Sequence, residues 1–257
     1  MVYRTGDLHG ECPRFNTSAF PDQRNMSKKD IVIVCGDFGL IWRQSNGADE
    51  RYWLDWLNDK PFTTLFVDGN HENFTRLNSD EFPTVDLFKG KAQQIRPSIY
   101  RLLRGQIYEI EGKTFFAFGG ASSHDCEDGI LDPEAFPSDK AFEAEYHRWR
   151  TERRRFRVKG VSWWPEEMPS EEEMESGIKA LESVNYEVDY VVTHCLPQDV
   201  VSVLSNCTFY PDRLTMYFND LLHRGLRFQE WMCGHYHCDR RVMGKFRVLY
   251  QDIERFL

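Results

Sequence analysis

Short apolar runs recur along the chain, and most of them are rich in β-branched and aromatic residues. Each run is continuous and is bounded by residues that favour turns, a pattern typical of buried strands rather than of helices. A further short strand is expected just before Gly6. The predicted strands are Ile31–Val34, Thr63–Val67, Thr114–Phe118, Tyr190–Thr193, Phe228–Met232 and Phe246–Tyr250.

Helical periodicity lies between several of these strands. Asp49–Asn58 places apolar residues on one face and ends before Pro61. The sequence Ser170–Glu173 is a capping box, which predicts that a helix begins there. Pro211–Arg224 has a third apolar face, and Gly225 is a natural C-terminal stop.

The order of these elements indicates the fold class. Strands alternate with helices in the first part of the chain, whereas Ile107–Phe118 contains a Glu111-Gly112-Lys113 turn and predicts a hairpin. This combination favours an α/β fold with mixed sheets. The stretch at about 125–169 breaks the rhythm, so we expect a single domain over residues 1–257 with an insertion or cap at about 125–169.

Composition excludes several classes of protein. With 41% hydrophobic and 14% aromatic residues among 257, the chain is not intrinsically disordered. Its longest apolar run falls short of the roughly 20 residues that span a bilayer, and polar residues from Asp7 onward disfavour a signal peptide. Seven cysteines without a C-x-x-C pair suit a reducing compartment. We therefore expect a soluble, cytoplasmic protein with no membrane partner.

The formal net charge of −9 sets a limit on partners, because a negative chain as a whole repels nucleic acid and anionic membranes. A basic cluster still runs from Arg148 to Lys159. It could attract a phosphate-rich substrate, but we favour a solvated helix balanced by neighbouring glutamates. Trp163-Trp164 could likewise cap a site, and we favour an aromatic anchor that docks the following helix.

Polar, chemically reactive residues follow the ends of five predicted strands. They lie in Gly6–Gly10, Gly36-Asp37, Gly69–Glu72, Thr193-His194 and Gly234–His237. Sites in open α/β sheets form at the carboxyl ends of strands, so the five turns are expected to converge on one crevice. Each motif alone is weak, and the hypothesis rests on all five occurring in order at strand ends.

The residue types in these turns suggest a metal centre. Carboxylates, an amide and imidazoles suit Mn, Fe, Zn, Ni or Co, and the shortage of thiolates argues against a structural zinc site. Seven candidate ligands exceed what one ion requires from a protein. Two ions that share a carboxylate fit this number better.

Together, Gly6-Asp7-x-His9, Gly36-Asp37, Gly69-Asn70-His71-Glu72, Thr193-His194 and Gly234-His235-x-His237 closely resemble the calcineurin-like metallophosphoesterase signature. The resemblance is strongest to stand-alone bacterial or phage members. It implies a four-layer sandwich of two mostly mixed β-sheets flanked by helices. It also implies a metal-dependent phosphoric ester hydrolase acting on a phosphodiester or a phosphomonoester.

The resemblance assigns roles to individual side chains. It gives one ion to Asp7, His9, Asp37 and His237, and the other to Asp37, Asn70, His194 and His235. Asp37 would bridge the two divalent or trivalent ions, for which we expect Mn first, with Fe, Zn, Ni or Co as alternatives. The attacking group would be a metal-bridging hydroxide, with His71 protonating the leaving group; the implied catalytic residues are thus His71 and Asp37.

Substrate recognition is the least determined part of this interpretation. Protein phosphatases of the superfamily carry arginines after the second motif and before the third, where this chain has Phe38 and Val67-Asp68. A phosphoprotein phosphatase therefore remains only an alternative. The replacement candidates for substrate contact are Arg43, Arg76, His124 and Asp125, although the last two could equally belong to a glycine-rich surface turn.

The expected substrate is a phosphorylated small molecule, a nucleotide or a nucleic-acid end. The missing arginines tilt the choice slightly toward a diester, because monoesterases often hold the dianion with extra cations. A non-catalytic interaction module that retains the fold is the competing hypothesis. Such a module should have lost Asp37, Asn70 or His71, and a metal-storage protein would not need His71.

Overall fold

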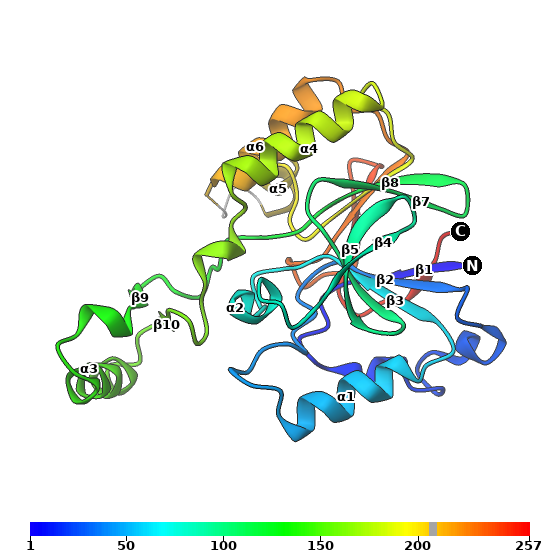
Figure 1. Ribbon diagram of the computed structural model, residues 1–257. Helices are drawn as coiled ribbons and strands as arrows, with labels where there is room; N and C mark the ends of the chain where they lie inside the picture. Colours follow the sequence, from blue (N-terminus) through cyan, green and yellow to red (C-terminus); the bar gives the residue numbers. More distant parts are fainter. Residues whose placement is uncertain (206–209) are drawn as a thin grey trace.

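The computed structural model describes residues 1–205 and 210–257, and its strands form two large sheets packed face to face (Figure 1). The first sheet has seven strands in the order β15-β1-β2-β3-β6-β5-β4. Strands β1, β2, β3 and β6 are parallel to one another, and the remaining pairs β15–β1, β6–β5 and β5–β4 are antiparallel. The bounds are β1 (Val2–Thr5), β2 (Ile31–Val34), β3 (Thr63–Phe66), β4 (Thr84–Leu87), β5 (Gly90–Arg96), β6 (Ile99–Leu102) and β15 (Glu254–Arg255).

The second sheet has six strands in the order β13-β14-β12-β11-β8-β7. Its inner four strands are parallel, and an antiparallel strand lies at each edge. The β7–β8 hairpin turns at Glu111 and Gly112, both at positive φ as a tight primed turn requires. The bounds are β7 (Gln106–Ile110), β8 (Lys113–Phe118), β11 (Tyr190–Thr193), β12 (Glu230–Cys233), β13 (Arg240–Val242) and β14 (Phe246–Val248).

Helices cover the outer face of each sheet, which gives four layers (Figure 1). Helix α1 (Ala48–Asn58) lies on the first sheet, and α4 (Glu171–Ser183), α5 (Gln198–Ser205) and α6 (Arg213–His223) lie on the second. The short α2 (Phe74–Leu77) follows β3, and 3-10 turns occur at η1 (Cys12–Phe15) and η2 (Pro21–Asn25). The expected four-layer sandwich of two mixed sheets is thus confirmed.

Side-chain alternation along the strands builds the core between these layers. Ile33 of β2 and Phe115 of β8 both belong to the apolar cluster between the sheets. The next residue of β2, Val34, packs in the cluster that contains α1, while Phe116 of β8 packs in the cluster that contains α6. Both faces of the central strands are therefore buried, which explains their continuous apolar sequence.

Most predicted elements are present, with ends shifted by one or two residues. The β3 strand ends at Phe66, β12 runs from Glu230 to Cys233, and Ser170 caps α4 through a complete capping box. The strands between Thr84 and Leu102 and helix α5 were not predicted from the sequence. The strand β5 carries polar residues at several positions, so its apolar pattern is weak.

Residues 125–169 form an arm that projects from the body of the molecule (Figure 1). The arm contains β9 (Ile130–Leu131), η3 (Pro133–Ala135), α3 (Asp139–Thr151), β10 (Arg157–Val158) and η4 (Pro165–Glu167). Strands β9 and β10 pair in parallel, so these two short strands lie side by side and run in the same direction. Within the described chain, α3 has no fully buried residue. The tip of the arm is thus held mainly by local contacts.

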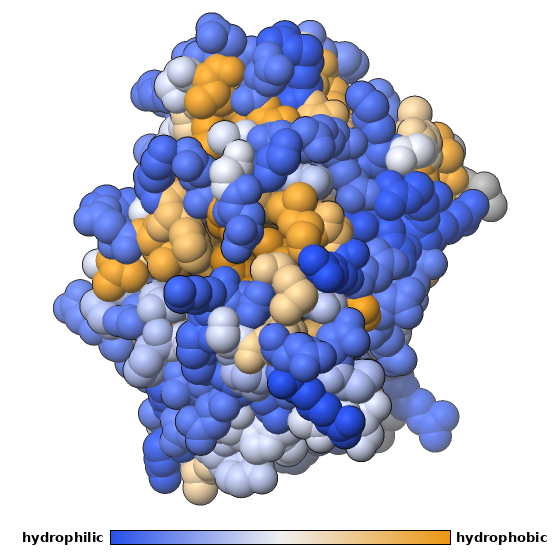
Figure 2. Space-filling view, turned by 90° about the vertical axis from the view of Figure 1, so that its right-hand side faces the viewer, coloured by the Kyte–Doolittle hydropathy of each residue, from blue (hydrophilic) through white to orange (hydrophobic). Residues whose placement is uncertain are grey.

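Among the described residues, the structure contains no helix with the length and apolar character needed to cross a bilayer. The face on which both termini lie is largely hydrophilic, with apolar side chains gathered across its middle (Figure 2). The terminal residues Phe256 and Leu257 are partly buried and pack against the cluster between the sheets. The chain end therefore helps to close this side of the sandwich.

Candidate metal centre

Parallel strands bring the five polar turns together. The turns after β1, β2 and β3 leave neighbouring parallel strands of the first sheet, and those after β11 and β12 leave neighbouring parallel strands of the second. The carboxyl ends of parallel neighbours meet at one edge of a sheet. Because the two sheets face each other, the polar side chains that follow the strands of one sheet lie close to those that follow the strands of the other.

Two motif glycines allow the central carboxylates to approach the backbone. A Cβ on Gly69 would lie 2.0 Å from Asp37 Oδ1, and one on Gly234 would lie 2.1 Å from Asp7 Oδ1. Backbone N–H groups just after these glycines bind the same oxygens. That of His71 donates to Asp37 Oδ1, and that of His235 donates to Asp7 Oδ1, each at 2.8 Å. Each carboxylate is thereby fixed through Oδ1 and directs Oδ2 to the shared space.

Asp7, His9 and His237 form the first group of potential ligands, whose ligand atoms lie within 4.8 Å of one another. His237 Nε2 lies 3.0 Å from Asp7 Oδ2, and His9 Nε2 lies 3.6 Å from it. The two imidazole nitrogens are 3.2 Å apart. Two nitrogens and a carboxylate oxygen therefore converge as they would around a cation.

Asp37 joins the other groups. With Asp7 and His194 it forms a fully buried group, and with His9 and His71 it forms a second, partly exposed one. His194 Nε2 lies 3.2 Å from Asp37 Oδ1, while Nδ1 donates to the carbonyl of Cys35 at 2.8 Å. Since a carbonyl only accepts, this contact orients the ring with Nε2 toward the carboxylates. Asp37 thus belongs to both of these groups of potential ligands.

Several buried polar atoms at this place lack a hydrogen bond to any described residue. They are Asp7 Oδ2, Asn70 Oδ1 and His194 Nε2. An unsatisfied buried polar atom costs about 1–3 kcal/mol, and native proteins contain few of them. All three atoms are of types that bind Mn, Fe or Zn. The donor set therefore fits divalent or trivalent cations.

The electrostatics of the cluster also favour cations. Burial would raise the pKa of Asp37, but the imidazoles of His194 and His71 hold it well below its usual range. Burial would lower the pKa of His194, yet the Asp37 carboxylate raises it to about 9. Burial likewise opposes the low pKa of Asp7, which His237 and His9 produce. The carboxylates are therefore ionised at neutral pH and hold a proton on His194, which a bound cation would displace.

The remaining predicted ligands lie at the edge of these groups. Asn70 is buried, and its Nδ2 lies 3.1 Å from His71 Nδ1. The ring of His235 lies 4.9 Å from that of His194, but its Nε2 faces His124 Nε2 at 2.8 Å. Burial and the neighbouring His194 hold the pKa of His235 well below its usual range, so its ring is neutral, as a metal ligand requires.

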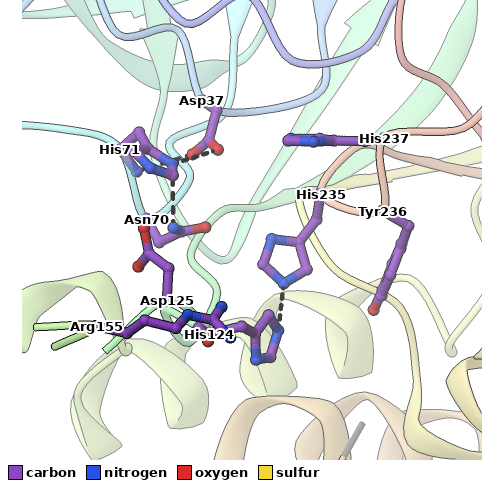
Figure 3. Close-up of a pocket in the computed structure, with 9 residues that line it drawn as sticks. All are labelled: Asp37, Asn70, His71, His124, Asp125, Arg155, His235, Tyr236 and His237. Atoms are coloured by element: carbon purple, nitrogen blue, oxygen red, sulfur yellow. Dashed lines mark hydrogen bonds and ion pairs between the residues drawn. The ribbon is translucent and has the colours of Figure 1, made fainter. Parts of the chain in front are cut away.

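A cavity of about 310 Å³ opens over the cluster (Figure 3). Two of the proposed substrate residues, His124 and Asp125, line it, and Arg155 and Tyr236 line it as well. The cavity is lined by Asp37, Asn70, His71, His124, Asp125, Arg155, His235, Tyr236 and His237. It therefore places open space directly beside the potential metal ligands.

The other two proposed substrate residues are not among the described lining residues. Arg76 is buried and pairs with Glu50 at 2.7 Å and with Glu81 at 2.6 Å, which supports α2. Arg43 is exposed and pairs with Asp49 at 3.3 Å. Neither arginine is brought to the cavity.

Arg155 lines the cavity, and Arg157 of β10 reaches His71 although it is not among the lining residues. Arg157 is 7% exposed, and its Nη2 lies 2.6 Å from His71 Nε2. The interpretation of the basic cluster as a solvated face is therefore wrong for Arg157, although Arg148 and Arg154 do pair with nearby glutamates. The alternation of charged and apolar residues through Arg157 is typical of a strand and was the available signal.

Trp164 acts as the expected aromatic anchor, but not on the helix that follows it. It is 3% exposed, its Nε1 donates to Thr75 Oγ1 at 2.8 Å, and its ring packs edge-on against Trp42. The base of the arm is thus fixed to α2, at the rim of the site. This placement holds β10 beside His71.

Comparison with known proteins gives one family. The family model described as calcineurin-like phosphoesterase matches residues 2–239, a range that includes every potential ligand named above. No curated protein matches the chain.

Proposed function

The chain belongs to the calcineurin-like phosphoesterase family, and we propose that it hydrolyses phosphate esters at a centre of two metal ions. The observation that carries this proposal is the set of buried ligand atoms on Asp7, Asn70 and His194 that lack a hydrogen bond to any described residue. A binding module without a metal would leave these atoms unsatisfied at a cost in stability. The open cavity beside them provides room for a substrate.

Seven side chains would hold the two ions. One ion would bind Asp7, His9, Asp37 and His237, and the other Asp37, Asn70, His194 and His235. Manganese is our first choice, because a set of carboxylate, amide and imidazole ligands without thiolate suits it; Fe, Zn, Ni and Co are alternatives. The ions would polarise the phosphoryl oxygens and provide a water of lowered pKa as nucleophile.

His71 is our candidate for the acid that protonates the leaving oxygen. Its Nδ1 lies 2.8 Å from Asp37 Oδ2, which fixes the plane of the ring. The opposite nitrogen, Nε2, is then directed away from Asp37, and His71 lines the cavity. Once an ester replaces this nitrogen as the partner of Arg157 Nη2, Nε2 could hold a proton, which would pass to the ester oxygen as the bond to phosphorus breaks.

The proposed substrates are phosphorylated small molecules, nucleotides and nucleic-acid ends, as monoesters or diesters. The test is hydrolysis of an aryl phosphomonoester and an aryl phosphodiester by the full-length protein, with added Mn(II) and with a chelator. We expect activity with Mn(II) on at least one ester and its loss in chelator. Equal turnover with and without chelator would refute a metal-dependent reaction.

A further inference from the structure

The arm holds the guanidinium of Arg157 at the site in a fixed orientation. Arg157 Nε and Nη2 each lie 2.6 Å from a different oxygen of Asp125. Its Nη1 donates to the carbonyl of Ser162 at 2.8 Å. These contacts use both edges of the planar group, so the position of Nη2 is set by the arm itself.

The same Nη2 also contacts His71. A guanidinium can only donate, so His71 Nε2 acts as the acceptor in this 2.6 Å contact. An anionic phosphoryl oxygen accepts from a guanidinium more strongly than a neutral imidazole does. Asp125 and His71 both line the cavity. An ester brought to His71 would therefore present its oxygens to Arg157 and could replace the imidazole as acceptor.

Arg155 provides a second guanidinium at the cavity. Side chains alternate along an extended chain, so Arg155 and Arg157 project to the same side. Arg155 lines the cavity, and its Nη2 lies 3.4 Å from the carbonyl of His124. Its ion pair with Glu127 is highly exposed on both sides, and pairs of that kind contribute little stability. The guanidinium of Arg155 can therefore turn toward a bound anion at little cost.

We propose that Arg157 binds the phosphoryl group that is transferred, with Asp125 as its positioning residue, and that this contact makes the site prefer phosphomonoesters to phosphodiesters. The inference rests on the proposed function. A monoester carries three unesterified oxygens and a diester only two. At the third position a diester has an esterified oxygen, which carries no charge and is a much weaker hydrogen-bond acceptor, so the buried guanidinium would lose a charged partner there.

Discrimination of this kind arises because a guanidinium binds a charged oxygen more strongly than an esterified one. With Arg157 beside His71, the absence of the two motif arginines no longer favours a diester. Asp125 does not oppose the binding of an anion, because Arg157 already neutralises it through two contacts. The arm thus takes the place of the arginines that protein phosphatases carry in their motifs.

The experiment compares Arg157→Gln and Arg157→Lys in the full-length, manganese-loaded protein. We expect Arg157→Gln to reduce kcat/KM for an aryl monoester by about 100-fold and for an aryl diester by less than about tenfold. Arg157→Lys keeps the charge without the planar fork and should fall between. Binding of inorganic phosphate, measured by calorimetry, should weaken by about tenfold or more, while manganese content stays unchanged.

Arg150→Gln is the matched control, because Arg150 is an exposed arginine of the same arm in α3. It should leave both esters and phosphate binding unchanged. Asp125→Asn gives a second variant if Arg157→Gln fails to fold, and should raise KM for the monoester more than it lowers kcat. Equal losses on both esters with unchanged phosphate binding would overturn the proposal, as would loss of manganese in the Arg157 variants.

Failure of the proposed function gives a different result. In that case the wild-type protein hydrolyses neither ester with any of the candidate metals. Phosphate binding can still be measured on such a protein. If Arg157→Gln then binds phosphate as well as the wild type does, the role of Arg157 is refuted independently.

Discussion

Asp37 holds His71 at two points, because its Oδ1 accepts from the His71 backbone N–H and its Oδ2 lies 2.8 Å from the ring Nδ1. One carboxylate therefore fixes both the loop and the ring of the proposed acid. The same Oδ1 lies 3.2 Å from His194 Nε2. Binding of metal and orientation of the acid are thus coupled through a single side chain.

Replacement of Asp37 should disturb both functions at once. In Asp37→Ala, His194 loses the carboxylate that faces it and His71 loses both contacts. We expect manganese content, measured by elemental analysis, to fall below two ions per chain and ester hydrolysis to fall by about 1000-fold or more. Two retained manganese ions per chain in this variant would argue against a bridging role for Asp37.

Replacement of His71 should separate the two functions. His71→Gln retains Asp37 and the other ligands, so manganese content should stay at the wild-type level. Hydrolysis of alkyl esters should fall by about 100-fold or more, because their leaving groups need a proton, while activated aryl esters should lose less. Comparison of kcat for the two esters provides the measurement. A loss of metal equal to that of Asp37→Ala would show that His71 is a ligand rather than the acid.

A methyl group on Gly234 should displace Asp7. The added Cβ would lie 2.1 Å from Asp7 Oδ1 and 2.6 Å from the carbonyl of Cys35. We expect Gly234→Ala to lose manganese and most activity while the circular dichroism spectrum stays native. Gly47→Ala is the control, since a Cβ there would meet nothing closer than 3.8 Å. Wild-type metal affinity in Gly234→Ala would contradict the tight packing around Asp7.

Glu167 should make stability depend on pH. Burial raises its pKa from 4.5 to about 7, against the hydrogen bonds that Ser123 donates to it. The unfolded chain therefore releases this proton at lower pH than the folded protein does. Relative to Glu167→Gln, the wild type should lose up to about 3 kcal/mol of unfolding free energy as pH rises from about 4.5 to 7.

Chemical denaturation at several pH values measures this difference. Glu166→Gln is the control, because Glu166 is exposed beside it. Its unfolding free energy should follow that of the wild type at each pH. Parallel curves for the wild type and Glu167→Gln would show that burial does not perturb the Glu167 carboxyl.

The convergence of the candidate metal ligands could be predicted from sequence, because these residues directly follow strand ends. Gly69 and Gly234 mark places where a carboxylate approaches the backbone, and parallel strands then bring the turns together. Arg157 could not be predicted in the same way. Its role depends on the path by which the arm returns to the body and on Trp164, which fixes the base of the arm to α2.

The strand β5 shows a second limit of prediction. Gln93 is polar but buried, since it donates to the carbonyl of Leu77 and accepts from Arg101. Its partners come from other elements, so nothing in the local sequence marks the strand. Arg76 was misjudged for the same reason, because its carboxylate partner Glu50 lies on α1.

The arm contributes Arg157 from its root, whereas α3 at its tip has no fully buried residue. Substitutions at the tip therefore change the outer surface of the protein without altering the position of the guanidinium. Over evolutionary time such a protrusion can acquire or lose binding partners while hydrolysis is preserved. The base and the tip of the arm can therefore respond to different selective pressures.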